Sequence, residues 1–282
     1  MAEAAPSRRR LNAKAVGGGG IVLTLAAVAA FAPLLAPHDP LDQDLLSALL
    51  PPRWIEGGDA SFPLGTDGLG RDMLSRLIFG ARVTIVVAVV AASAACLLGS
   101  LLGLVAGYLK GATDQAVSRL VDVWMAFPPV LLSIVLAAML GAGLTAVVIA
   151  IAVIDWTRFA RVIRAETLLQ SEMDYVAAAR MLGMRQGAIL LREVLPNLVP
   201  LILTLLSVEM GIAVVVEAIL SFVGVSVTTD FPTWGGMIAE GRQVIHQAWW
   251  VLLLPTLCLI VVVLGFNLLG DGLRQVIDPV HR

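Results

Sequence analysis

Long stretches of this sequence carry no charged residue, and this feature limits the fold more than any other. Val83 to Leu109 and Val123 to Ile154 are both free of charge. A transmembrane helix needs about 20 apolar residues to cross about 30 Å of hydrocarbon. Of the 282 residues, 59% are hydrophobic and only 14% are charged, whereas about a quarter of the residues in a soluble domain are charged. The sequence therefore predicts an integral membrane protein.

The apolar segments predict six membrane-spanning helices. Lipid cannot satisfy open backbone groups, so these spans must be helical. Two of the spans share the uncharged run Val123–Ile154, and the turn between them is expected at Gly141-Ala142-Gly143. Residues 116–122 would extend the first of these two helices to the membrane surface, and residues 155–161 the second. The predicted spans are Val16–Ala36, Val83–Leu109, the two within Val123–Ile154, Leu198–Val225 and Trp249–Gly270. We predict an all-α, polytopic fold, in which the first span is too long and lacks the cleavage pattern for a signal peptide.

Basic residues predict the orientation, because cytoplasmic segments of membrane proteins are enriched in Lys and Arg. With both termini inside, 14 of the 19 basic residues lie inside. We therefore expect a multi-pass membrane protein with cytoplasmic termini. Its expected parts are a cytoplasmic tail 1–15, a first span 16–36, an external segment 37–79, a core 80–271 that includes a cytoplasmic segment 157–197, and a cytoplasmic tail 272–282. A short amphipathic helix at 71–79 is expected to end the external segment.

The residues offer little support for catalysis. The glycines at 17–20 lack the GK[ST] ending of a phosphate-binding loop, so close helix packing is the better explanation for them. The three histidines lie far apart in sequence, and no cysteine pair has metal-ligand spacing. The net charge of −2 provides no basic field for nucleic acid. We expect a chain that is not an enzyme and that has no metal, cofactor or nucleic-acid site of its own.

The segment from Tyr175 to Asn197, YVAAARMLGMRQGAILLREVLPN, is the most informative part of the sequence. An alanine-rich stretch is interrupted at Gly183, and a second helical stretch from Arg185 is expected to end at Pro196. This pattern predicts two short helices at an angle, which would offer small residues to a partner protein. A loop that merely joins two spans is the alternative, and physical reasoning alone does not separate the two.

The spacing in this segment resembles the EAA motif of permease subunits in bacterial ATP-binding-cassette importers. That motif is EAA, three residues, Gly, nine residues, an apolar residue, one residue and Leu-Pro. The resemblance implies contact with an ATPase at Ala177, Ala178, Ala179, Gly183, Leu195 and Pro196. Two positions depart from the motif: Ala177 replaces the acidic residue, and Glu193 replaces the apolar one.

Four further stretches resemble the C-type permease of the dipeptide/oligopeptide/nickel branch of this family. They are PLGTDGLGRDMLSRLIFGAR at 63–82, VVEAILSFVGV at 215–225, PTWGGMI at 232–238 and FNLLGDGLRQVIDP at 266–279. The resemblance implies a location in the bacterial inner membrane, the type I importer fold and a homologous B-type permease partner. It also implies two ATPase subunits that hold ATP and Mg²⁺, an external solute-binding protein and surrounding membrane lipid. This chain would supply half of the pathway for short peptides and no catalysis.

Two acidic residues, Glu209 and Glu217, fall within the fifth predicted span. Charge inside a membrane is costly, so such a residue normally faces protein or water. We predict that both acids, together with Ser221, line the substrate pathway. The alternative is a structural acid held by a helix–helix hydrogen bond.

Two tryptophans, Trp249 and Trp250, stand at the start of the sixth predicted span. Aromatic residues of this kind are enriched where a helix meets the membrane–water interface. We predict that both anchor the span at that interface, which is a structural role.

Other transport classes remain open on the sequence alone. The same kind of importer could carry a nickel chelate or another small solute. A secondary transporter driven by an ion gradient could use the two acids as proton sites, although it would need no ATPase contact. The sequence does not name the solute, the host or whether the two ATPases are identical.

Overall fold

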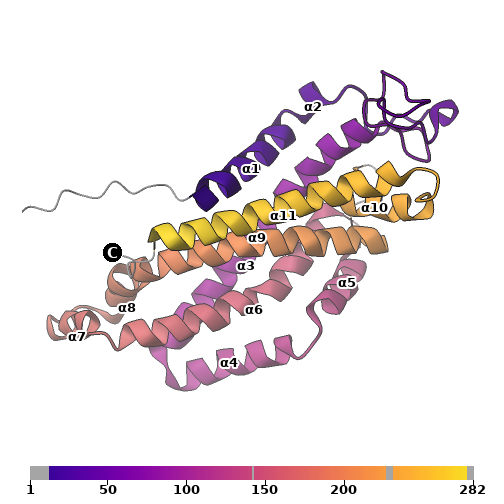
Figure 1. Ribbon diagram of the computed structural model, residues 1–282. Helices are drawn as coiled ribbons and strands as arrows, with labels where there is room; N and C mark the ends of the chain where they lie inside the picture. The colour runs from indigo at the N-terminus through magenta and orange to yellow at the C-terminus, as the bar shows by residue number, and fades with distance from the viewer. Residues whose placement is uncertain (1–12, 142, 227–230, 278–282) are drawn as a thin grey trace, which may run out of the picture.

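The computed structural model describes residues 13–141, 143–226 and 231–277. Within these ranges the chain is helical apart from turns, extended segments and one isolated bridge between Thr66 and Asp72, which confirms the predicted all-α fold (Figure 1). The α-helices are α1 (Ala13–Ala30), α2 (Ala32–Leu35), α3 (Met73–Leu109), α4 (Gly111–Met125), α5 (Pro129–Leu140), α6 (Leu144–Ser171), α7 (Asp174–Met181), α8 (Gln186–Ile189), α9 (Leu195–Val223), α10 (Trp234–Gln243) and α11 (Trp249–Ile277). A 3₁₀ turn at Leu45–Ser47 and a π-turn at Leu190–Val194 complete the helical elements.

The six predicted spans correspond to α1, α3, the α4–α5 pair, α6, α9 and α11. In the described part of the chain, four of these are long and apolar enough to cross a membrane by themselves: α1, α3, α9 with the turns before it, and α11. The α4–α5 pair meets the criterion as one bent unit. Helix α6 is 28 residues long, but it carries Asp155 and Arg158 near its middle.

The third span is not the single continuous helix that the sequence predicted. Helices α4 and α5 meet at an angle of 87°. Pro128 and Pro129 stand at the bend, where each proline lacks a backbone donor and pushes the preceding residue out of helical geometry. The predicted continuation of one helix through this point was wrong, because two consecutive prolines terminate a helix even within an apolar run.

Helix α3 is longer than predicted and includes the expected amphipathic segment. It begins at Met73, where the Asp72 carboxylate accepts a hydrogen bond from the Ser75 backbone N–H at 2.8 Å. The predicted boundary between residues 79 and 80 therefore falls inside one continuous helix, and the separate helix at 71–79 was wrong. Helix α11 likewise continues past residue 271 to Ile277. The tails 1–12 and 278–282, and Ala142 of the predicted turn, lie outside the described residues.

Three glycines spaced four residues apart bring α3 against α6. A Cβ atom at Gly99 would stand 2.1 Å from the Trp156 carbonyl oxygen, and one at Gly103 would stand 2.7 Å from that of Ala160. Gly107 makes the same kind of contact with α6 one turn further on. Small residues at this spacing allow two backbones to approach closely within a membrane. The α3–α6 pair therefore forms the tightly packed centre of the bundle.

The glycine tract at 17–20 packs α1 against α11. A Cβ at Gly18 would lie 2.3 Å from the Leu269 backbone nitrogen, whereas one at Gly17 or Gly20 would meet nothing within 4 Å. The packing explanation is confirmed at Gly18. In Figure 1 the α7–α8 region lies at one end of the bundle, and α10 and the segment before α3 lie at the other.

Candidate functional site

The α7–α8 element, defined here as residues 174–196, has the two-helix form that the sequence predicted. Helix α7 ends at Met181, and Gly183 follows with a backbone φ of +78°. That left-handed conformation is strained for residues with a side chain. Arg185 then leads into α8. Gly183 therefore permits the sharp change of direction between the two helices.

Buried side chains anchor the α7–α8 element to the ends of three long helices. Val176 and Ala179 from α7 and Ile189 from α8 belong to one apolar cluster with Leu104 of α3 and Ile163 of α6. Leu198 of α9 completes the contact. Because these contacts reach several spans at once, a displacement of the element would be transmitted directly into the bundle.

Hydrogen bonds reinforce the same attachment. The Tyr175 hydroxyl donates to Gln170 Oε1 at 2.7 Å. The Asn197 side-chain amide donates to the Tyr175 hydroxyl at 3.3 Å. Tyr175 therefore links the end of α6 to the start of α9.

The predicted coupling residues divide between the surface and the core. Ala177, Ala178, Gly183 and Pro196 are exposed. Ala179 is buried and Leu195 is half-buried, so these two hold the element in place and present little surface. A Cβ at Gly183 would meet nothing within 4 Å, so the space there opens outward to a partner or to solvent.

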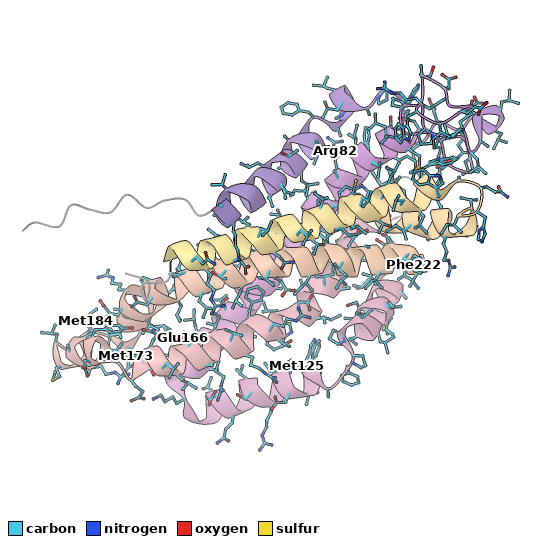
Figure 2. The ribbon with its side chains drawn as sticks, viewed as in Figure 1. Arg82, Met125, Glu166, Met173, Met184 and Phe222 are labelled. Atoms are coloured by element: carbon cyan, nitrogen blue, oxygen red, sulfur yellow. The ribbon has the colours of Figure 1, made fainter. Side chains whose placement is uncertain are left out.

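Sequence reasoning missed the most exposed apolar residues of this element. Met181 and Leu182 are each 83% exposed, directly before the Gly183 turn. Met173 and Met184 lie at the same end of the molecule (Figure 2). Two consecutive apolar residues beside a helix break are a signal that could have identified this tip.

The second predicted helix does not end at Pro196. A π-turn at Leu190–Val194 joins α8 to α9, and the Leu195 backbone N–H bonds the carbonyl oxygen five residues earlier, at Leu190. Pro196 then falls in the first turn of α9, where its missing N–H costs little. The predicted stop was wrong because the π-turn restarts the helix and makes Pro196 an early residue of α9.

Glu217 is entirely buried near the end of α9. Its Oε1 accepts a hydrogen bond from the Ser221 hydroxyl at 2.5 Å and another from the Ser226 hydroxyl at 3.4 Å. The carboxylate thus ties the end of α9 to the following loop. A solute could reach it only after α9 or that loop moves, and its pathway role stays a prediction.

Glu209 is 3% exposed and faces α6. Its Oε2 lies 3.6 Å from Arg158 Nη1. Arg158 Nε also lies 3.9 Å from Asp155 Oδ1. Sequence reasoning singled out Glu209 but missed Arg158, its basic neighbour on α6.

A cluster of four charged residues, three of them buried, lies at the opposite end of the bundle. Arg71 donates to Asp67 at 2.7 Å and to both oxygens of Glu240 at 3.0 Å. Arg76 is only 4% exposed and pairs with Asp67 and with Glu240. We call these four residues the external clasp, after the side on which the sequence predicts segment 37–79 to lie. They tie α10 to the beginning of α3.

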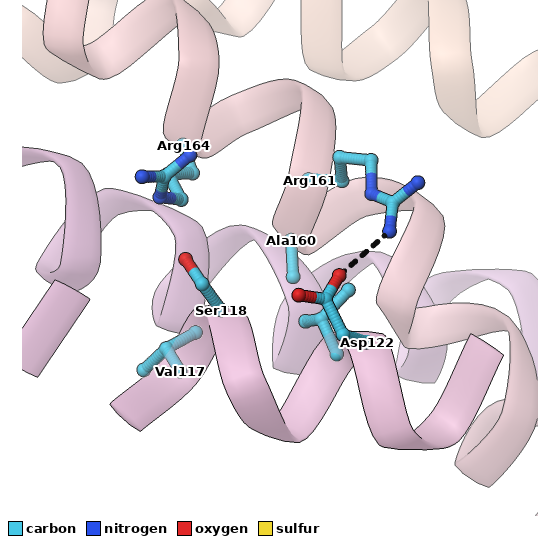
Figure 3. Close-up of a pocket in the computed structure, with 7 residues that line it drawn as sticks. Val117, Ser118, Asp122, Ala160, Arg161 and Arg164 are labelled. Carbon is cyan, nitrogen blue, oxygen red and sulfur yellow. Dashed lines mark hydrogen bonds and ion pairs between the residues drawn. The ribbon is translucent and has the colours of Figure 1, made fainter. Parts of the chain in front are cut away.

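A hollow of about 330 Å³ lies between α4 and α6 (Figure 3). Its charged residues are already paired, Arg161 with Asp122 at 3.1 Å and Arg164 with Asp114. These pairs hold α4 along α6 and leave no free charge for a ligand. Within the described residues, no cluster of His, Cys, Asp or Glu could hold a metal ion.

Comparison with known proteins gives related permeases along nearly the whole chain. The family described as "Binding-protein-dependent transport system inner membrane component" matches residues 99–281. A second family, the "N-terminal TM domain of oligopeptide transport permease C", matches residues 8–52. The chain is 40% identical to the di/tripeptide transport system permease protein DppC of Pseudomonas aeruginosa, over 95% of this chain and 88% of the relative.

Other relatives have similar coverage. The dipeptide transport system permease protein DppC of Escherichia coli K12 is 40% identical over 95% of this chain and 89% of its own length. The glutathione transport system permease protein GsiD of Pectobacterium atrosepticum is 37% identical over 94% of this chain and 86% of its own length.

A solved structure supports the fold independently. A chain of the MetNI methionine ABC transporter, in an inward-facing conformation, superposes with a TM-score of 0.62 at 18% identity. The superposition covers 73% of this chain and 98% of that one. The fold is therefore that of an ABC importer permease, and the chain belongs to the family of binding-protein-dependent transport system inner membrane components.

Proposed function

We propose that this permease subunit supplies half of the pathway by which an ATP-driven importer takes up short peptides. The similarity to di/tripeptide and dipeptide permeases over about the whole chain carries this proposal. The glutathione permease among the relatives transports a molecule that is itself a small peptide derivative. A homologous permease chain supplies the other half, and an external binding protein delivers the solute.

Two ATPase subunits drive transport from the cytoplasm, and one of them docks on the α7–α8 element. The exposed Met181 and Leu182 support this assignment, because apolar side chains at a surface tip are typical of a protein contact. The buried anchors Val176 and Ile189 support transmission of the ATPase motion to α3, α6 and α9. ATP and Mg²⁺ bind the ATPases, and this chain contributes no nucleotide site.

Both termini and the α7–α8 element face the cytoplasm in this proposal. The predicted cytoplasmic segment 157–197 begins inside α6, which continues to Ser171, so only the last turns of α6 reach that side. The excess of basic residues on that side supports the orientation. The position of the α7–α8 element at one end of the bundle and of the external clasp at the other agrees with it (Figure 1).

Uptake by the reconstituted complex tests the proposal. Proteoliposomes containing both permease chains and both ATPases, supplied with the binding protein, should accumulate a labelled dipeptide only when ATP is supplied on the ATPase side. An uncoupler should leave this uptake unchanged. Uptake that follows a proton gradient without ATP would instead identify a secondary transporter. Uptake of glutathione or a nickel chelate in place of the dipeptide would reassign the solute class.

A further inference from the structure

Arg158 carries an incompletely paired positive charge in the middle of a membrane-spanning helix. It stands fourteen residues into α6, about 21 Å along an axis that rises about 1.5 Å per residue. Glu209 stands fourteen residues into the antiparallel α9. Both residues therefore occupy the middle of their helices, where a charged group must face protein or water.

The guanidinium of Arg158 has hydrogen-bonding capacity that the chain does not use. Its two acidic neighbours lie 3.6 Å and 3.9 Å from its nitrogens, which is beyond hydrogen-bond distance for both. None of its nitrogen atoms makes a hydrogen bond to any residue that the structure describes. Because the side chain is 42% exposed, these donors are accessible at the surface of the subunit.

Asp155 and Glu209 lie on the buried side of this guanidinium. Their side chains are only 5% and 4% exposed. Glu209 Oε1 is buried and receives no hydrogen bond from the described residues. The cluster thus presents a basic group outward and keeps acceptors beneath it.

We propose that Arg158 binds the C-terminal carboxylate of the peptide as it passes through the pathway. A guanidinium forms paired hydrogen bonds with a carboxylate, which makes it a specific partner for that group. This inference rests on the proposed peptide-import function and adds a specificity-determining residue to it.

Charge balance favours a peptide over an acidic side chain of the partner permease. The cluster already contains two acids and one base. A permanent third acid at the subunit interface would stand near Asp155 and Glu209 at all times, in surroundings that screen charge poorly. A zwitterionic peptide brings an ammonium group with its carboxylate, so it adds no net charge.

The test compares a labelled dipeptide with its C-terminal amide in ATP-driven proteoliposomes containing the whole complex. The measured quantity is the ratio of the two uptake rates, because the binding protein's own preference is common to every variant. Arg158→Gln should lower this ratio about tenfold, the effect of losing one charge-assisted hydrogen bond. Arg161→Gln is the matched control, because Arg161 lies one turn away and already pairs with Asp122. Its ratio should not change.

A second variant keeps the test decisive if Arg158→Gln assembles poorly. Arg158→Lys retains the charge but not the forked geometry, so the ratio should fall part of the way. An unchanged ratio in either variant would overturn the assignment. Loss of co-purification with the partner permease in Arg158→Gln but not in Arg161→Gln would show a subunit contact and also overturn it. The wild-type complex tests the importer proposal separately, since it must show ATP-driven dipeptide uptake.

Discussion

The two ends of this bundle are built in opposite ways. At one end the α7–α8 element exposes Met181 and Leu182 and is attached through apolar contacts. At the other end the external clasp joins the buried side chains of Asp67, Arg71 and Arg76 to the partly exposed Glu240. An exposed apolar tip is available for contact with another protein, whereas a largely buried network of ion pairs fixes the relative positions of the elements that it joins.

Labelling from outside the cell tests most directly whether the two ends lie on opposite sides of the membrane. In a variant without Cys96 and Cys258, a cysteine at Ala60 should react fully with a membrane-impermeant reagent in whole cells. A cysteine at Gln186 should react only after permeabilisation. Both positions are exposed in the structure, so burial cannot explain a difference. The opposite pattern would reverse the orientation and remove the proposed ATPase contact.

Breaking the external clasp should cause the largest loss of stability. In Arg76→Met, Asp67 and Glu240 each lose one of their two arginine partners. Removing one member of a buried ion pair costs about 3–5 kcal/mol. Arg53→Met is the control, because Arg53 is exposed in the same segment. Thermal unfolding of the purified protein in detergent measures the effect. Equal losses in both variants would mean that the clasp does not fix this end.

An acidic substitution at each end of the bundle tests whether the exposed apolar residues there contact an ATPase or are merely exposed. Leu182→Asp should lower ATPase co-purification tenfold or more, since burying an unpaired charge at a contact is costly. Leu46→Asp changes a residue that is 98% exposed in the segment before α3 and should leave co-purification unchanged. Neither variant should lower the folding stability of the chain. Normal ATPase binding by Leu182→Asp would remove the tip from the interface.

Substitutions at two glycines test whether the turn at Gly183 is needed for transport. Gly183 and Gly224 have φ values of +78° and +82°, and a Cβ atom added at either position would meet nothing within 4 Å. Alanine should therefore strain each by a similar amount, about 1–2 kcal/mol. Only Gly183→Ala should also slow ATP-driven uptake, because Gly224 ends α9 away from the ATPase contact. Equal uptake by the two variants would leave residues 175–197 as a connecting loop.

The smallest expected effect concerns the exposed pair of Lys110 and Glu172 beneath the α7–α8 element. The Lys110 ammonium lowers the pKa of the Glu172 carboxyl below its ordinary value of 4.5. The pair therefore stabilises the fold above that value and loses its effect as pH falls through the folded-state pKa. Lys110→Met should lower the unfolding temperature slightly at neutral pH. The difference from wild type should disappear in acid and in concentrated salt, and a difference that persists would assign the effect to packing.

Several parts of the fold followed from local sequence patterns. The uncharged runs identified the spans, and the break at Gly183 identified two short helices. The prolines at 128 and 129 are equally visible in the sequence, yet the hydrophobicity of the run outweighs them, and the 87° bend was missed.

Trp250 shows why such patterns can mislead. Its position at the start of a span predicts a side chain at the membrane interface, but Trp250 is buried and its indole N–H donates to the Thr66 carbonyl oxygen at 3.1 Å. An aromatic residue at the start of a span can have either role, and only its neighbours decide which.

The sequence by itself determined that the chain enters a membrane, that its spans are helical, and which family its motifs resemble. These properties depend on the length of the apolar runs and on the spacing of residues along the chain, so they can be inferred without knowing how distant segments pack. Only the tertiary structure decided which charges meet, because Arg158 and Glu209, or Arg76 and Glu240, are far apart in sequence and join when separate helices pack. The same is true of exposure: Met181 and Ala179 are two residues apart, and the packing of α7 leaves one at the surface and buries the other.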